Sequence, residues 1–583
     1  MMLKKLIRQM VITQTVSELI VNVCLMIDAI MIGQFLGIES LSAYGYSAPI
    51  ILIFTAISGM ICTGSQVLSG RTVAVGDKNG TDSCYSSSIT FSLLISIIGS
   101  LIVLLFANQI IPLLGAGANT PSNTVFHLTK DYLFGFLIGT PAFMIMKLMV
   151  PYLQMAGERK QILITTLLAS VTDIILNLLN VFVFKFGIFG MGLASAISYY
   201  IASIFAITLF VKKVKIFNFN LSLVNKNTIF QIIKNGLSLL ILHLCLVTLP
   251  LLRNHLLTSY GGSIAVAAYS TVSSIGNLSY APIFACMTII ISLSSMFFAE
   301  KDKNSIRKSL KIVLEYLTIM YVVIIFVLLV AAKPIVLLFT DNLEAIDLAA
   351  VGLRWFALSL LPCGLSATMG HYYQGTGRSK LAITVTVLQN FVFAAVCSIL
   401  FATLFGSIGI WIGIVVTEIA TMAFVIINAF IRNKKISFSL DNFLLLPKEF
   451  GVKEKDCLQK SITNQKEVMD ASKEAEEFCK KHGLDKKKSY HIGLAIEELG
   501  NNIIEYGFID GKKHVIDIRI VINKESTILC IKDNCSKFDP VKYMELHQDD
   551  DPFAHLGIRM IMRIVKDANY SNSFGLNNLL LEL

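Results

Sequence analysis

The sequence predicts an α-helical polytopic membrane protein of about twelve transmembrane helices, arranged as two parallel six-helix lobes, followed by a C-terminal α/β sandwich domain. Hydrophobic residues make up 55% of the 583 residues and charged residues only 15%, whereas a soluble domain has about a quarter of its residues charged. About half of the charged residues lie after Leu440, in the last quarter of the chain. The chain therefore divides into an apolar part, up to about residue 435, and a soluble part.

The apolar part contains repeated stretches that are long enough to cross a bilayer as helices, with short polar loops between them. Lys4, Lys5 and Arg8 lead into the first stretch without a small-residue cleavage site, so we expect no cleavable signal peptide. The expected spans are 12–34, 48–70, 88–114, 131–152, 161–184, 190–211, 236–257, 270–298, 312–338, 354–373, 381–404 and 407–431.

Basic residues are concentrated in alternate loops, which hold about 22 of them against about five in the intervening loops. Cytoplasmic loops are the ones rich in Lys and Arg, and an even number of spans then places both termini in the cytoplasm. Of the net charge of +10, the membrane part contributes about +13 and the tail about −3. This distribution indicates a multi-pass protein of the cell (inner or plasma) membrane, in contact with the lipid bilayer, and argues against nucleic-acid binding.

The membrane part contains an internal repeat. Gly37-Ile-Glu-Ser-Leu-Ser-Ala-Tyr44 recurs as Gly262-Ser-Ile-Ala-Val-Ala-Ala-Tyr269, and Asp77-Lys-Asn79 recurs at the same offset as Asp302-Lys-Asn304. Further matches are Gln154-Met-Ala-Gly157 with Gln374-Gly-Thr-Gly377, and Gly187 and Gly190 with Gly406 and Gly409. Because each half holds six spans, the halves have the same orientation, as in transporters whose two lobes rock around a central cavity.

The first half resembles the multidrug and toxic compound extrusion (MATE) family. The resemblance rests on Asp28-Ala-Ile-Met-Ile-Gly33, on Gly37 with Leu41-Ser-Ala-Tyr44, and on Gly76-Asp77. It extends over nearly all of residues 1–435 and includes both repeats. It implies an ion-coupled secondary efflux transporter for small molecules, namely organic cations or drugs.

Carboxylates inside predicted membrane helices are functional candidates by default, because a charge there costs roughly 3 kcal/mol or more unless it faces a polar cavity. Asp28 lies in the middle of the first span, and Asp173, Asn177 and Asn180 share one face of the fifth. The MATE resemblance implies that such residues line the N-lobe cavity and bind H⁺ or Na⁺. The family commonly has Asn before Asp in the fifth span, whereas here Asp173 comes before Asn177.

An alternative interpretation is that these side chains only hydrogen-bond neighbouring helices. Glu418, in the last span, is a further candidate with the same two interpretations, and Cys24 is expected to be an inert packing residue. No GxxxxGK[ST] motif occurs in the sequence, so the chain is not a P-loop pump. Transport is therefore expected to be driven by an ion gradient.

We divide the chain into an N-lobe (1–215), an inter-lobe linker (216–235), a C-lobe (236–435), a second linker (436–465) and a soluble domain (466–583). Within the soluble domain, 467–482, 489–508 and 556–565 have helical periodicity, and 515–522, 527–533 and 578–583 alternate as strands do. This pattern predicts an α/β sandwich of ordinary domain size.

Three stretches of the soluble domain, in the right order, resemble the boxes of the GHKL (Bergerat-fold) ATPases, and are most similar to the serine kinases that act as anti-sigma factors. The stretches are Glu498-x-x-x-Asn502-x-x-x-Tyr506, Asp533-Asn-Cys-Ser-Lys-Phe-Asp-Pro540 and His555-Leu-Gly557-Ile-Arg559. The stretch from Tyr570 to Asn577 matches the closing pattern of the family.

The resemblance implies that the domain binds ATP and Mg²⁺. Glu498 would be the general base, and the Asn502 oxygen would bind the magnesium ion held by the phosphates. Asp533 would accept the adenine amino group, and the backbone at Gly557 would hold phosphate at a helix N-terminus. Asp539 and Asn577 belong to the same cofactor-binding set.

Two positions depart from the GHKL pattern, which has glycine where Cys535 and His555 stand here. Cys535 could fit if its backbone torsions are ordinary. The unusual run Asp549-Asp-Asp551, in the expected nucleotide lid, is interpreted as a solvated loop. ATP binding is therefore predicted, while turnover, as an ATPase or as a serine/threonine kinase, stays open.

The function predicted is an ion-coupled (H⁺ or Na⁺) efflux transporter of MATE type with a cytoplasmic ATP-binding regulatory domain, which could bind a regulatory protein of anti-anti-sigma type. One alternative is a membrane-anchored kinase of anti-sigma type. The other is a flippase for a lipid-linked saccharide, which would need a wide basic cavity.

Overall fold

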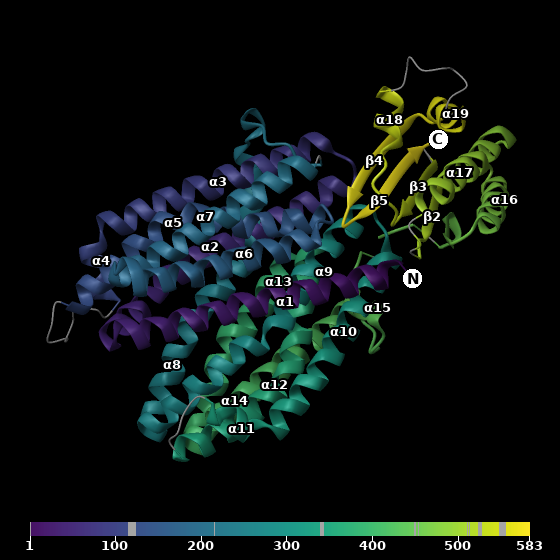
Figure 1. The fold of residues 1–583 in the computed structure, drawn as a ribbon. Coiled ribbons are helices and arrows are strands. Elements are labelled where there is room, and N and C mark those ends of the chain that lie inside the picture. Colours follow the sequence, from purple (N-terminus) through teal and green to yellow (C-terminus); the bar gives the residue numbers. More distant parts are fainter. Residues whose placement is uncertain are drawn as a thin grey trace.

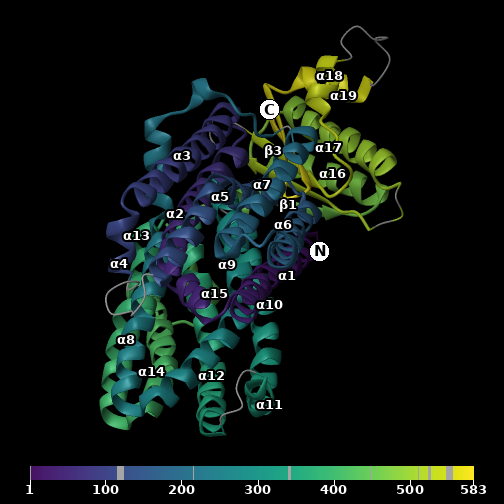
Figure 2. The same ribbon diagram turned by 60° about the vertical axis from the view of Figure 1, so that its left-hand side comes forward.

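The structure is a computed structural model that describes residues 2–114, 124–214, 216–338, 343–447, 450–452, 454–509, 511, 513–522, 527–546 and 556–583. Two helical lobes and a smaller α/β domain make up the molecule, and the α/β domain lies at one end of the lobes (Figure 1). We call this the domain end. The helices of the two lobes lie close together there and diverge towards the opposite end (Figures 1 and 2).

The N-lobe is built from long apolar helices joined by short turns. Its elements are α1 (Met2–Met31), η1 (Ile32–Leu36), α2 (Ile38–Ala74), α3 (Lys78–Leu105), α4 (Ala107–Leu113), α5 (Thr124–Met155), α6 (Arg159–Leu179), η2 (Asn180–Phe184), α7 (Gly187–Lys213) and the short η3 (Leu221–Leu223). Segments η1 and η2 are π-helical turns that continue α1 and α6.

The C-lobe repeats this arrangement. Its elements are α8 (Lys226–Ser279), α9 (Ala281–Ala299), α10 (Lys303–Val330), α11 (Ala332–Leu337), α12 (Leu343–Gly375), α13 (Ser379–Val387), η4 (Leu388–Val392), α14 (Phe393–Asn433) and α15 (Leu440–Leu444).

Within the described residues, 11 helices are long and apolar enough to span a membrane. One of them covers 55 residues, from Ser379 to Asn433, although about 20 residues suffice for one crossing. Its backbone leaves the helical conformation at Gly406, with φ 63° and ψ −143°. The two arms on either side of Gly406 are therefore separate crossings. Counted in this way, the described chain has the twelve crossings that the sequence predicts.

The internal repeat is visible in the backbone. Gly37 and Gly262 both have positive φ, at 89° and 65°, and each separates two helices of its lobe. Only glycine adopts this conformation without steric cost. Gly157 and Gly377, with φ 79° and 82°, and Gly187 and Gly406, with φ 62° and 63°, are paired in the same way. The repeated glycines therefore mark equivalent turns in the two lobes.

The lobes are in direct contact near the domain end. The Gln66 amide of α2 donates to the Thr288 carbonyl of α9 at 3.1 Å, and also bonds Ser292. The Arg71 guanidinium of α2 donates to the Gly375 carbonyl of α12 at 3.3 Å. These bonds join the two lobes across the domain end.

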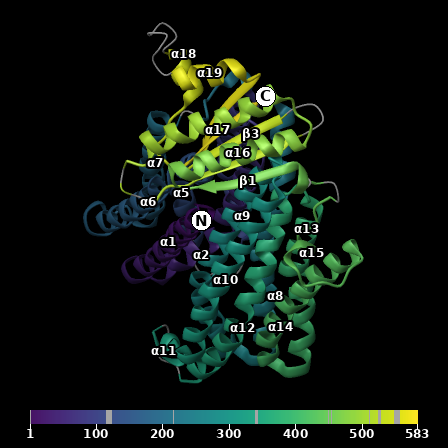
Figure 3. The same ribbon diagram turned by 90° about the vertical axis from the view of Figure 1, so that its right-hand side faces the viewer.

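The C-terminal domain is a sheet covered on one face by helices. Within the described residues the sheet has five antiparallel strands in the order β1-β2-β3-β5-β4. Helices α16 and α17 cover the face turned away from the lobes, and the other face is turned towards them (Figures 1 and 3). The elements are η5 (Glu454–Asp456), β1 (Cys457–Ile462), α16 (Gln465–Lys481), α17 (Lys486–Gly507), β2 (Ile516–Ile522), β3 (Thr527–Asp533), α18 (Pro540–Leu546), α19 (Leu556–Ile564), β4 (Asp567–Ser573) and β5 (Leu576–Glu582).

Two of the predicted boundaries differ from the structure. The segment 436–465, predicted to be a linker, contains strand β1, which pairs with β2 at the sheet edge. The domain therefore begins by Cys457 and not at residue 466. The predicted linker 216–235 is also shorter, because α8 already begins at Lys226, where the Asn225 side chain caps the helix.

Helices α2 and α8 cross so closely that their glycines touch the partner backbone. A Cβ added to Gly64 would lie 2.0 Å from the Ile232 oxygen, whereas one added to Gly370 would meet only Val385, at 3.5 Å. Both glycines lie inside helices, where the intrinsic helix propensity favours alanine over glycine by about 1 kcal/mol. We predict that Gly64→Ala destabilises the protein by about 1–3 kcal/mol through overpacking, whereas Gly370→Ala does not. Thermal melting of the two purified variants would test this, and equal melting temperatures would contradict it.

Candidate functional sites

A cluster of buried polar side chains joins α1 and α6 inside the N-lobe. Asp28 of α1 and Asp173 and Asn177 of α6 are 8%, 5% and 1% exposed. The Asn177 amide donates to Asp28 Oδ1 at 3.0 Å and to Asp173 Oδ2 at 3.3 Å. The structure therefore brings three of the four predicted transport residues into one site.

Two oxygens of this cluster remain without a hydrogen-bond partner within the described residues. They are Asp173 Oδ1 and Asn177 Oδ1. Leaving a buried polar atom unpaired costs about 1–3 kcal/mol, so these oxygens can accept a further donor or bind a cation. Carboxylate and amide oxygens are the ligands that hard cations prefer. A carboxylate also accepts a proton, so the cluster suits either ion.

Cys24 belongs to this cluster, although the sequence predicts a packing residue. Its thiol lies 3.6 Å from Asp173 Oδ2 and 3.9 Å from the Ser170 carbonyl oxygen. The ligand atoms of Cys24, Asp28 and Asp173 all lie within 4.8 Å of one another. Cys24 and Asp28 are four residues apart on one helix and therefore lie on the same face. This spacing is the signal that could have identified Cys24 as part of the cluster.

Asn180, the fourth predicted transport residue, lies outside the cluster. Its amide donates to the Gly187 carbonyl at 2.8 Å, and its Oδ1 accepts from the Phe186 backbone N–H at 3.1 Å. Both ends of the amide thus hold the turn between η2 and α7. These contacts support a positioning role for Asn180.

Within its described residues, the C-lobe does not repeat the carboxylate cluster. The repeat offset that relates Gly37 to Gly262 places Arg253 where the N-lobe has Asp28. The Arg253 guanidinium donates to Ser398 Oγ at 3.2 Å. Deeper in the lobe, Glu418 accepts from Gln389 at 2.7 Å. The two lobes therefore share a fold but differ in the charge that they place at this position.

In the C-terminal domain, Asp533 and Asn577 are neighbours on β3 and β5 and form one buried network. The Asn577 amide donates to Asp533 Oδ1 at 2.8 Å and to the Ser536 carbonyl at 3.0 Å. Its own oxygen accepts from Tyr570 at 2.6 Å and from Asn572 at 2.8 Å. The closing segment of the domain therefore fixes the orientation of the Asp533 carboxylate.

The electrostatics of Asp533 follow from its burial. Burial raises the pKa of the carboxyl above its ordinary value, and the hydrogen bonds from Asn577 and from the Cys535 backbone N–H, at 2.9 Å, offset part of this effect. Asp533 thus takes up a proton at a higher pH than a solvated aspartate does.

The first and third boxes meet where α17 faces the start of α19. A Cβ added to Gly557 would lie 2.1 Å from Glu498 Oε2, so the carboxylate rests directly against the glycine. The second box contacts the end of α17 at Gly507, directly after the first box, where an added Cβ would lie 2.8 Å from Cys535 Sγ. Cys535 is not among the described residues with positive φ, so its side chain is compatible with the turn.

The remaining predicted residues have different surroundings. Asn502 is half-buried on α17, one turn after Glu498. Asp539 caps α18, since its carboxylate accepts from the backbone N–H of Val541 at 3.1 Å and of Lys542 at 3.0 Å. His555 and the run 549–551 lie outside the described residues.

Residues 15–179 and 240–404 each match the sequence model of the MatE family, once in each lobe, and together they cover more than half of the chain. The chain belongs to the MATE family. Residues 463–582 match the family described as histidine kinase-like ATPase domain. The protein is therefore a multi-pass MATE transporter with a histidine kinase-like ATPase domain fused to its C-terminal end.

Relatives of this MATE protein include the multidrug export protein MepA of Staphylococcus aureus, which is 25% identical over 408 residues, or 69% of this chain and 88% of the relative. MepA of Staphylococcus saprophyticus is 24% identical over 404 residues, with the same coverage.

Among solved structures, a variant of the MATE transporter VcmN of Vibrio cholerae matches with a TM-score of 0.69 and 21% identity, covering 75% of this chain and 99% of that one. An outward-facing multidrug resistance MATE transporter of the MOP superfamily matches with a TM-score of 0.68 and 20% identity, covering 72% and 94%. At these identities the two matches show a common fold.

The contact between Gly557 and Glu498 predicts a non-additive pair of substitutions. Gly557→Ala should destabilise the domain, because the new methyl group displaces the Glu498 carboxylate. In a Glu498→Ala background the same change should cost less, with a coupling of about 1 kcal/mol, as expected for residues in contact. Chemical or thermal unfolding of the four proteins would measure the coupling. Purely additive effects would contradict the placement of Glu498 against this glycine.

Proposed function

We propose that this MATE protein is an ion-coupled efflux transporter for organic cations and drugs, and that its ATPase domain is a cytoplasmic ATP-binding regulatory domain. The observation that carries the transport part is the buried cluster of Asp28, Asp173 and Asn177, with its two unpaired oxygens. Carboxylates in a membrane helix are retained when they bind a transported ion or its counter-ion.

The coupling ion that we propose is H⁺ or Na⁺. Asp28 and Asp173 come from different helices, α1 and α6, and the Asn177 amide bridges them. A bound proton or sodium ion would remove one of the two negative charges and draw these helices together, whereas its release would leave two charges that favour rehydration. Binding and release of the ion would in this way favour different arrangements of the lobe.

The proposed substrate class is supported by the chemistry of the N-lobe and by the relatives of the chain. The relatives named MepA are multidrug export proteins. Tyr44 and Tyr132 pack edge-to-face at 5.3 Å, and both rings lie within electrostatic range of the buried carboxyl groups of Asp28 and Asp173. Aromatic faces with nearby carboxylates favour cationic, apolar ligands.

The ATPase domain supplies the residues for a nucleotide. Asp533 is held as an acceptor for the adenine amino group, and Gly557, at the start of α19, leaves room for the Glu498 carboxylate. Asn502 would bind Mg²⁺ through an oxygen, and bound Mg²⁺ neutralises phosphate charge. A cytoplasmic position of the domain is supported by the basic residues of the loops on the same side.

We predict that Asp28→Asn and Asp173→Asn each reduce efflux to background, because a neutral amide cannot alternate between a charged and an ion-bound state. Asp347→Asn is the matched control, since Asp347 is 70% exposed in its ion pair with Lys333. Uptake of a fluorescent cation by proteoliposomes, under an imposed H⁺ or Na⁺ gradient, would measure this and identify the ion. Efflux at the wild-type level in Asp28→Asn would contradict the proposal. If the protein is instead a membrane-anchored kinase, Glu498→Ala should abolish its regulatory output and Asp28→Asn should leave that output intact.

We predict that the full-length protein binds Mg²⁺-ATP and that Asp533→Asn weakens binding about tenfold or more, because a hydrogen bond to a charged group contributes about 1.5–3 kcal/mol. Asp470→Asn, on the exposed face of α16, should have no effect. Affinity should also fall on acidification, at a pH above the ordinary aspartate range, because the pKa of Asp533 is raised. Equilibrium binding of a fluorescent ATP analogue would test all three. Equal affinities in all variants would exclude this nucleotide site.

A further inference from the structure

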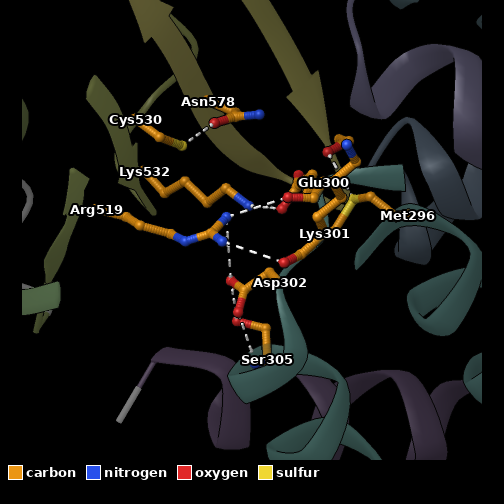
Figure 4. A network of polar contacts seen from close by, with 10 residues as sticks. Met296, Glu300, Lys301, Asp302, Ser305, Arg519, Cys530, Lys532 and Asn578 are labelled. Atoms are coloured by element: carbon orange, nitrogen blue, oxygen red, sulfur yellow. Dashed lines mark hydrogen bonds and ion pairs between the residues drawn. The ribbon is translucent and has the colours of Figure 1, made fainter. Parts of the chain in front are cut away.

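The face of the sheet opposite the ATP-site helices carries a group of charged residues directed at the transporter. Side chains alternate between the two faces of a strand, so Lys532 and Asp533, which are consecutive on β3, point in opposite directions. Asp533 belongs to the nucleotide network, whereas Lys532 and Arg519 of β2 point towards the loop between α9 and α10 (Figure 4).

Lys532 forms a buried ion pair with the C-lobe. Its ammonium lies 2.6 Å from Glu300 Oε2, and the two side chains are only 15% and 7% exposed. The ammonium also lies 5.3 Å from the centre of the Phe297 ring. Burial would lower the pKa of Lys532, but the Glu300 carboxylate raises it above its ordinary value, so Lys532 stays charged.

Arg519 binds the backbone of the same turn. Its guanidinium donates to the carbonyls of Glu300 and Lys301, each at 3.3 Å, and lies 3.9 Å from Asp302 Oδ2. Burial would raise the pKa of Asp302, but the guanidinium and nearby donors lower it below its ordinary value. The C-lobe turn is thus held by two cations through both side-chain and backbone oxygens.

The hairpin of β4 and β5 binds the N-lobe. At its tip the Phe574 N–H donates to the Met155 carbonyl at 2.6 Å, and Arg159 donates to the Phe574 carbonyl at 2.6 Å. A Cβ added to Gly157 would lie 2.2 Å from the Gly575 nitrogen. The hairpin tip therefore packs directly against the turn between α5 and α6.

The domain also binds the equivalent turn in each lobe. Gly76 and Lys301 are related by the internal repeat and both have positive φ, at 72° and 51°. The Asn569 amide of β4 donates to the Gly76 carbonyl at 3.1 Å, as Arg519 of β2 does to the Lys301 carbonyl at 3.3 Å. One domain therefore holds the symmetry-related turns of both lobes.

We propose that the C-terminal domain is a clamp that keeps the lobes together at the domain end, so that the transporter opens there only after one lobe has left the sheet. This proposal rests on the proposed transport function, in which the lobes rock against each other. Strands β2 and β3 contact the C-lobe, and β4 and the hairpin tip contact the N-lobe, while Ser573 of β4 also contacts Met296 of α9 at 3.5 Å. All of these strands belong to one hydrogen-bonded sheet. A sheet cannot stretch to follow two separating lobes, so opening breaks one set of contacts.

The ion pair allows a direct test, because leaving one buried charge without its partner is strongly destabilising. In the full-length protein in nanodiscs, hydrogen–deuterium exchange of the domain-end halves of α2 and α9 would report opening. Lys532→Glu and Glu300→Lys should each increase this exchange, on the order of tenfold or more. The double charge swap should return it towards the wild-type rate.

A matched control lies on the outer face of the domain, where Lys480 pairs with Glu476 at 3.2 Å. Lys480→Glu should leave exchange in the lobes unchanged. Wild-type exchange in both single variants of the Lys532–Glu300 pair would overturn the clamp, as would a double swap that stays as open as the single variants. ATP binding is measured in the same proteins. Wild-type protein that binds no ATP would refute the proposed nucleotide site and leave the clamp standing.

Discussion

A single hydrogen-bonded sheet lies across the ends of two lobes, and this constraint determines how the two parts of the molecule act on each other. The lobes are joined at the domain end by Gln66 and Arg71, and the sheet adds a second layer of bonds over the same end. Asp533, the proposed adenine acceptor, and Lys532 of the proposed clamp are neighbours on β3. The proposed nucleotide site and the lobe contacts therefore lie on opposite faces of one strand.

Charge is used differently in the two environments of the protein. In the N-lobe, Asp28 and Asp173 share one amide and retain unpaired oxygen capacity, an arrangement that suits an ion that comes and goes. At the interface between lobe and domain, the Lys532 ammonium pairs with Glu300 Oε2 at 2.6 Å, while Glu300 Oε1 has no hydrogen-bond partner within the described residues. The N-lobe site thus joins its two carboxylates through a neutral amide, whereas the interface joins a carboxylate to a cation.

Much of the fold could be predicted because its signals are local. The lengths of the apolar stretches predict the membrane spans, and the repeated glycines, which have positive φ in the structure, mark the equivalent turns. Strand β1 was missed because it is an edge strand with exposed polar residues, and such a sequence is typical of a polar linker. Cys24 was missed because buried cysteine is usually inert. The ion pair of Lys532 with Glu300 joins residues 232 positions apart, and no local pattern indicates it.

The central claim is that one domain binds both lobes in the closed state and cannot follow both when they separate. Spin-label distances from the domain to each lobe, measured together with the distance between the lobes at the domain end, would test it during turnover. We predict that, in molecules opened at this end, one of the two domain–lobe distances increases while the other stays constant. Lobes that separate while both domain–lobe distances remain unchanged would contradict the account.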